Sequence, residues 1–164
     1  MSIFWLFLLR ILKIDRFKYR TLTLGEITLC QRVFGDLIDY EKVKVLNQPY
    51  LPWQPVHMFM APEGYIHSRD ENYSLDYSQE SLGYQAVFIH EMAHIYQHQQ
   101  GINVLLKGAI LQIAHYLSFC RYDPYDYQFD ANKDFWQYNI EQQGDIAKDI
   151  FLQKIPNIID KTQS

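Results

Sequence analysis

The second half of the chain carries apolar residues at helical spacing, with polar and glycine-containing breaks between the runs. One run follows Ser78 or Ser81, either of which can cap a helix. It stops before Gly101, a residue type that is favoured just beyond a helix end. A further run covers Val104 to Phe119. The pattern therefore predicts a long helix followed closely by a second one.

Two more helices are predicted from capping and stop signals. Thr23-Leu-Gly-Glu26 matches a capping box, in which the two side chains accept from backbone N–H groups, and it predicts a helix up to about Phe34. Near the other end, helical spacing runs from Phe135 to Lys154. Pro156 ends that helix because proline cannot continue one.

Strand patterns are short and few. Val43–Leu46 predicts one strand, and Val56–Met60 and Tyr65–Ser68 flank the turn Ala61–Gly64 and predict a hairpin. A short strand is also expected at Tyr127–Phe129, inside a tyrosine-rich loop. Together these elements predict a helix-rich α+β fold with a small β-sheet or hairpin.

Composition adds limits to this picture. The chain has 164 residues, of which 48% are apolar, and neither a repeat nor a linker divides it, so we expect one domain over residues 1–164 with a core over residues 21–154. With 15 basic and 19 acidic residues the net charge is −4, which does not favour nucleic acid as a partner. Cys30 and Cys120 form no CxxC pair and are expected to be small buried side chains.

The N-terminal segment, residues 1–20, combines an apolar run with basic residues. Ile3–Leu12 is too short to span a bilayer, which needs about 20 residues, and it lacks the flanks of a signal peptide. We therefore expect synthesis in the cytoplasm, with any export by a non-standard route. The run either docks in the core or contacts a membrane surface or carrier protein. The basic residues are Arg10, Lys13, Arg16, Lys18 and Arg20.

The long central helix contains the motif HExxH, formed by His90, Glu91 and His94. Residues four apart share a helix face, so both imidazoles can bind one metal ion, and imidazole is a preferred ligand of Zn²⁺. Zinc lowers the pKa of bound water from 15.7 to about 7, and Glu91 is placed to take its proton as general base. The motif therefore predicts a hydrolytic zinc site.

A catalytic zinc needs a third protein ligand. In the last predicted helix Glu141 and Asp145 lie four apart, so Glu141 can complete a His₂Glu site while Asp145 accepts a ring N–H of a ligating histidine. The reverse assignment, with Asp145 on the metal, stays open, and so does a plain solvated face. Gly144 is disfavoured inside a helix and indicates close approach to the HExxH helix. His98 is an alternative ligand, but it lies about 12 Å from His90 along a straight helix.

HExxH followed downstream by ExxxD resembles the gluzincin branch of zinc metallopeptidases. The resemblance implies a zincin-like fold, with His90, His94 and Glu141 holding zinc. It also implies that Glu91 is the catalytic base and that Asp145 supports a ligand. These roles follow from the resemblance, not from the spacing of the two motifs or from the composition.

A narrower resemblance covers about residues 22–151. The strings LTLGEITLCQRVFGDLIDY, APEGYIH, AVFIHEMAHIYQHQQGINVLL and YNIEQQGDI are similar to Vgr-related and Rhs-associated zinc metallopeptidases, bacterial proteins linked to type VI secretion. This resemblance implies a secreted effector with a carrier, an immunity protein, and peptides or peptidoglycan as substrate.

Other groups can complete the site. The predicted hairpin is a candidate edge for pairing with an extended peptide, or it simply covers the core. An oxyanion donor is also expected, and Tyr116, His115 and Tyr138 are candidates, although His115 also suits a buried structural role. Further candidates are Tyr65, His67 and Tyr122.

The sequence as a whole favours a zinc metallopeptidase that hydrolyses amide bonds. Two alternatives remain at this stage. One is a peptidoglycan amidase or endopeptidase toxin, which shares the chemistry but differs in substrate. The other is a non-catalytic zinc-binding adaptor of a secretion apparatus, whose site would be closed by four protein ligands.

Overall fold

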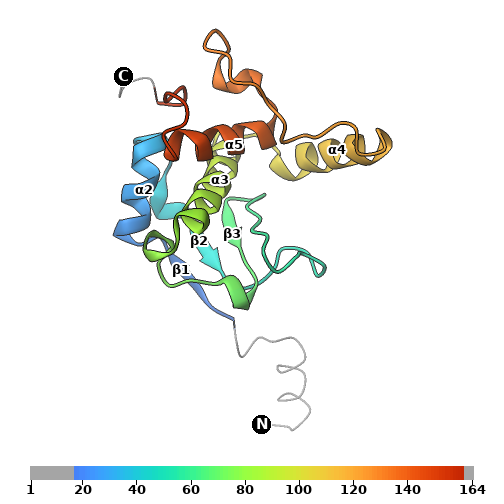
Figure 1. Ribbon diagram of the computed structural model, residues 1–164. Coiled ribbons are helices and arrows are strands. Elements are labelled where there is room, and N and C mark those ends of the chain that lie inside the picture. Colours follow the sequence, from blue (N-terminus) through green and yellow to red (C-terminus); the bar gives the residue numbers. More distant parts are fainter. Residues whose placement is uncertain (1–16, 161–164) are drawn as a thin grey trace, which may run out of the picture.

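The computed structural model describes residues 17–160, so the apolar run Ile3–Leu12 lies outside the described residues. The elements form a helix-rich α+β domain, as predicted (Figure 1). The strands are β1 (Tyr19–Thr21), β2 (Lys44–Leu46) and β3 (Tyr65–His67), and the α-helices are α2 (Leu24–Phe34), α3 (Leu82–Gln99), α4 (Val104–Leu117) and α5 (Ile140–Phe151). Short 3₁₀ helices occupy Tyr40–Lys42, Asp70–Asn72, Tyr77–Gln79 and Phe135–Gln137.

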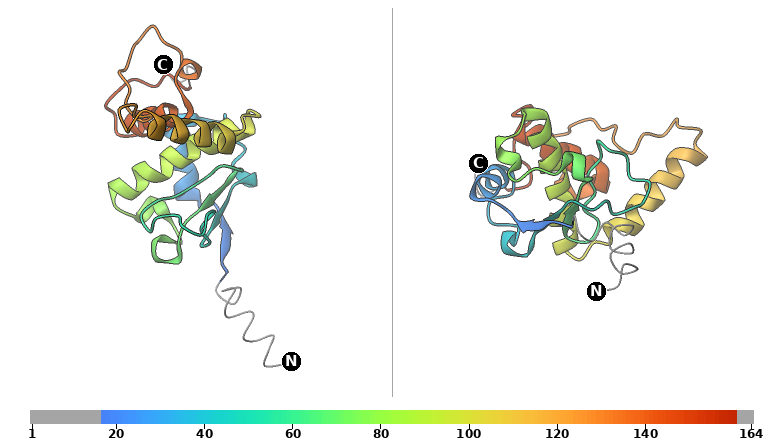
Figure 2. Two further views of the ribbon diagram at one scale, coloured as in Figure 1. Left: turned by 90° about the vertical axis from the view of Figure 1, so that its right-hand side faces the viewer. Right: turned by 90° about the horizontal axis from the view of Figure 1, so that it is seen from below.

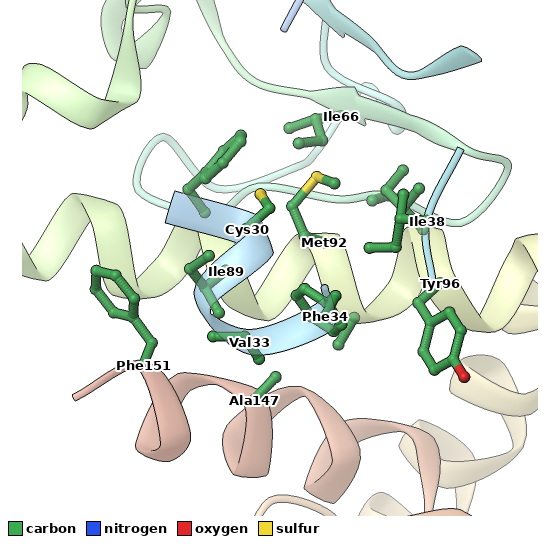
Figure 3. Close-up of a cluster of buried hydrophobic side chains, with 14 of the residues drawn as sticks. Cys30, Val33, Phe34, Ile38, Ile66, Ile89, Met92, Tyr96, Ala147 and Phe151 are labelled. Atoms are coloured by element: carbon green, nitrogen blue, oxygen red, sulfur yellow. The ribbon is translucent and has the colours of Figure 1, made fainter. Parts of the chain in front are cut away.

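Helix α3 lies in the middle of the domain, between the sheet on one side and α5 on the other (Figures 1 and 2). Side chains from several elements meet around it in one hydrophobic core (Figure 3). The fully buried members include Val33 and Phe34 of α2, Ile89 and Met92 of α3, and Ile66 of β3. This packing fixes α3 on most of its sides and leaves one stripe of the helix for the candidate metal centre.

The sheet has the order β1-β2-β3, and β3 is paired parallel to β2. The predicted hairpin forms only in part, because a single antiparallel bridge, Met60 to His67, joins its two halves. The buried Gln54 accounts for this arrangement. Its amide donates to the carbonyls of Met58 and His67 and so holds residues 54–58 as a loop beside β3. Strand β1, within the basic segment, was not predicted.

The predicted helices are confirmed, with shifted ends. The C-terminal helix begins at Ile140 rather than at Phe135, because Asn139 accepts from two backbone N–H groups and forms its own capping box with Gln142. Residues 127–129 form no strand, in contrast to the prediction. Cys120 is exposed, so the expectation of two buried cysteines holds only for Cys30.

Helix α4 projects from the rest of the domain, and the chain returns from its far end to α5 (Figures 1 and 2). Apolar side chains are exposed along it: Leu105, Leu106, Ile110, Ile113, Tyr116 and Leu117. Within residues 17–160, no helix is both long enough and apolar enough to cross a membrane.

The first turn of α2 contains a buried ion pair that joins three elements. Glu26 is 0% exposed and receives both terminal nitrogens of Arg20, at 2.7 and 2.8 Å. Its carboxylate also accepts from the backbone N–H groups of Thr23 and Tyr77. Each oxygen of the Glu26 carboxylate thus accepts two hydrogen bonds, and together these bonds join β1, α2 and the segment before α3.

We expect Glu26→Ala to lower the free energy of unfolding by about 3–5 kcal/mol, because it leaves the largely buried Arg20 charge without a carboxylate partner. Urea unfolding followed by circular dichroism measures the change. Asp39→Ala is the control, since its pair with Lys42 is exposed and its loss should be barely measurable. Equal destabilisation by the two variants would contradict this account.

Candidate metal centre

Two imidazoles project from consecutive turns of α3. His90 and His94 have ring centroids 4.9 Å apart, and both side chains are almost entirely buried. Their neighbours along the helix, Ile89 and Met92, are fixed in the core. The close packing of α3 therefore orients both rings toward the same space.

Glu141 approaches the two rings from the first turn of α5. Its Oε2 atom lies 3.6 Å from the Nε2 atom of His90 and 3.6 Å from that of His94. Potential ligand atoms of these three residues all lie within 4.8 Å of one another. Tetrahedral ligands at zinc distances of 2.0–2.1 Å stand about 3.3 Å apart, so His₂Glu fits a zinc ion with little movement.

Asp145 lies one turn beyond Glu141 and contacts the other side of a ring. The Nδ1–H of His90 donates to its Oδ1 at 3.1 Å, and Lys148 donates to the same oxygen. This arrangement leaves the Nε2 atom of His90 facing Glu141, where a metal ion can replace its hydrogen. The geometry thus favours Glu141 as the ligand and Asp145 as the support, over the reverse assignment.

Gly144 permits the close approach of α5 to α3 that its presence indicated. A Cβ atom at this position would lie 2.5–2.7 Å from three atoms of the His90 ring, a distance that real Cβ atoms essentially never show. The missing side chain therefore makes room for His90.

Charge is distributed unevenly over the metal-free site. Burial opposes protonation of His90, but the hydrogen bond to Asp145 and the nearby carboxylate of Glu141 outweigh it and raise the pKa of this imidazole to about 9. Burial likewise opposes ionisation of Glu141, yet its attraction to the two histidines holds the pKa of that carboxyl well below its usual range. A cation is thus already the favoured partner of Glu141.

Glu91 differs from the other acidic residues of the site. It is 6% exposed, and its Oε2 atom has no hydrogen-bond partner within residues 17–160. Burial raises the pKa of Glu91, while the neighbouring histidines lower it in part. A buried carboxylate oxygen without a partner is costly to keep, and a role in proton transfer gives a reason for it.

The structure adds two residues that the sequence patterns did not single out. Tyr125, in the segment that returns from α4, lies with its ring centroid 6.2 Å from that of His90, and the nearby carboxylate of Glu141 contributes to the raised pKa of its hydroxyl. Asn139 and Gln142 hold this segment through the carbonyls of Pro124 and Asp126. Gln97 hydrogen-bonds to His94. Only the density of tyrosines between residues 122 and 127 could have drawn attention to Tyr125.

The oxyanion donors proposed from the sequence make other contacts in the structure or are exposed. Tyr116 is exposed on α4, and the His115 ring contacts the carbonyl of Tyr122. Tyr138 is buried, and its hydroxyl accepts from the N–H of Asp130. His98 packs near Gly64, where a Cβ atom would lie 2.9 Å from its ring. Among the residues described, the cluster of potential ligands consists of His90, His94 and Glu141 and includes neither His115 nor His98.

Comparisons with known proteins place the chain in a family. No family model matches the sequence. The effector domain of Pseudomonas aeruginosa VgrG2b, a solved structure, is 48% identical, with a TM-score of 0.74 over 81% of this chain and 73% of that chain. The chain belongs to the family of the VgrG2b effector domain. This membership links it to type VI secretion.

The full-length VgrG2b protein is much longer than this chain. The type VI secretion system spike protein VgrG2b of Pseudomonas aeruginosa PAO1 is 48% identical over 136 residues, which are 82% of this chain but 13% of the spike protein. The VgrG2b similarity therefore concerns the effector part, and the Vgr-related resemblance expected from the sequence is confirmed at that level.

We expect Asp145→Asn to weaken zinc binding by about 10–100-fold, because a neutral amide orients and polarises the His90 ring less strongly than a carboxylate. A competition titration with a zinc chelator measures the change. Asp149→Asn is the matched control on the same helix, where the carboxylate contacts Lys154 and Tyr127 instead. Unchanged affinity in Asp145→Asn would remove Asp145 from this role.

Proposed function

We propose that this chain is a zinc-dependent metallopeptidase that hydrolyses amide bonds as a type VI secretion effector. The observation that carries the proposal is Glu91, which follows His90 on α3 and whose buried Oε2 atom has no hydrogen-bond partner within residues 17–160, beside a His₂Glu cluster. A site that only held a structural metal would have no use for such a group.

The geometry suggests a separate role for each group of the site. A zinc ion held by His90, His94 and Glu141 would polarise the scissile carbonyl and acidify the attacking water. Glu91 accepts the proton of that water and passes it to the leaving amine. Burial and the neighbouring carboxylates raise the pKa of Tyr125, so its hydroxyl stays protonated and can donate to the developing oxyanion.

The effector context supports the remaining parts of the proposal. A protein with this family membership is expected to have a secretion carrier, such as a VgrG spike, and an immunity protein in the producing cell. The substrate is a peptide, or the peptide portion of peptidoglycan.

The test compares zinc-loaded and zinc-stripped protein on a diverse peptide library, with cleavage followed by mass spectrometry. Cleavage by the zinc-loaded protein alone is the expected result. Purified peptidoglycan is incubated in parallel. Release of peptidoglycan fragments without peptide cleavage would redirect the proposal to a cell-wall amidase or endopeptidase. Absence of both activities, with zinc bound, would favour the non-catalytic adaptor.

A further inference from the structure

The two histidines of the metal centre differ in the group that holds their Nδ1 atoms. His90 contacts the carboxylate of Asp145, whereas the Nδ1 atom of His94 lies 2.9 Å from the amide oxygen of Gln97. We propose that Gln97 is a positioning residue that fixes the tautomer of His94 and ties this ring to α5. The inference rests on the proposed function in one respect, namely that His94 binds metal.

The orientation of the Gln97 amide follows from its other contacts. Its Nε2 atom donates to the carbonyl of Ile140 at 3.0 Å and to Oε1 of Gln143 at 2.9 Å. Gln143 cannot be reversed, because its own Nε2 donates to the carbonyl of Tyr138 at 2.8 Å. Both hydrogens of the Gln97 amide are therefore used on α5, and its oxygen must face His94.

The fixed orientation of the Gln97 amide determines which nitrogen of His94 carries a hydrogen. An amide oxygen only accepts, so the Nδ1 atom of His94 must carry the hydrogen. In the neutral imidazole the Nε2 atom therefore carries the lone pair, and it is the atom that lies 3.6 Å from Glu141. Gln97 thus prepares His94 for metal binding without adding a charge to the site.

Burial makes the arrangement difficult to replace by solvent. Gln97 is 0% exposed, Gln143 is 3% exposed and His94 is 6% exposed. Buried polar groups that lose their partners are costly, so the whole chain of hydrogen bonds is formed together. Since it ends on the carbonyls of residues 138 and 140, it also sets the position of Glu141 relative to His94.

The test uses two substitutions of similar shape. Gln97→Met removes the oxygen that accepts from His94, whereas Gln97→Glu keeps an acceptor there, and both lose the amide donors toward α5. We expect Gln97→Met to bind zinc about 10–100-fold more weakly than wild type. Gln97→Glu should bind zinc more tightly than Gln97→Met does, although it too loses the contacts to α5. A merely structural role predicts equal loss in both, and that result would overturn the proposal.

Gln99→Met is the matched control on α3. Gln99 also makes two hydrogen bonds, but with the backbone of Asp39 on the exposed side of the helix. Its substitution should leave zinc affinity unchanged. Thermal unfolding of the metal-free variants separates a loss of stability from a loss of affinity.

A second measurement needs no variant. Nitrogen-15 NMR of the zinc-loaded wild type should show a slowly exchanging proton on Nδ1 of His94 and a metal-bound Nε2. A proton on Nε2, with Nδ1 bound to zinc, would overturn the proposal. Neither readout involves a substrate, so zinc binding without peptide cleavage would contradict the proposed peptidase and leave the role of Gln97 standing.

Discussion

Replacing Glu91 by glutamine should reduce the rate of peptide cleavage by about 100- to 10,000-fold, the range that a positioned general base contributes. Glutamine has nearly the same shape but cannot take a proton from water. The carboxylate is buried and has a raised pKa, so its loss removes a base that is tuned by the site. Single-turnover assays with a cleaved library peptide measure the effect.

Zinc binding distinguishes a catalytic role of Glu91 from a ligand role. Glu91→Gln should retain one zinc ion per chain, since the cluster of ligand atoms consists of His90, His94 and Glu141. His94→Ala should lose the metal and the activity together. If Glu91→Gln also lost the metal, the carboxylate would belong to the coordination shell and the assignment of a base would fail.

Gly144→Ala should weaken zinc binding by at least about 100-fold, comparable to the larger losses caused by disturbing a ligand's support. The added methyl group would lie 2.5–2.7 Å from the His90 ring, so either the ring or α5 must move. Helix propensity alone would make the metal-free alanine variant more stable than wild type, because alanine is favoured over glycine inside a helix by about 1 kcal/mol. Chelator competition, with Tm of the metal-free protein alongside, measures both effects.

Gly83→Ala provides the comparison for Gly144→Ala. A Cβ at Gly83, also inside a helix, would meet only the Ser81 hydroxyl at 3.9 Å. This variant should bind zinc as wild type does. Equal zinc affinity in the two alanine variants would mean that the approach of α5 to α3 does not position His90.

Local signals predicted the helices well, because capping and helical spacing involve residues near one another. The Thr23–Glu26 capping box forms as expected. The sheet was harder to predict. Lys44–Leu46 pairs with Tyr65–His67 in parallel, and no short-range pattern distinguishes that pairing from a hairpin with residues 56–60. The late start of α5 depends on Asn139, whose capping role was overlooked.

The candidate site divides in the same way. His90, Glu91 and His94 lie on adjacent turns of one helix, so their relation could be derived from spacing. The third ligand was less determined, because spacing within one helix does not show which carboxylate far along the chain lies beside the two histidines. Gln97 and Tyr125 depend on how α5 and the returning segment pack against α3, and a single sequence contains no signal for that packing. Whether each group acts as assigned stays a prediction.

The unequal burial of the two cysteines offers a means of selective chemical labelling. Cys30 is fully enclosed in the core, and burial raises the pKa of its thiol, so it reacts slowly with maleimides and similar reagents. Cys120 is exposed just beyond the end of α4. A fluorophore or nitroxide attached there, without any engineered residue, would report on the surroundings of the projecting helix when a carrier, an immunity protein or a vesicle is added.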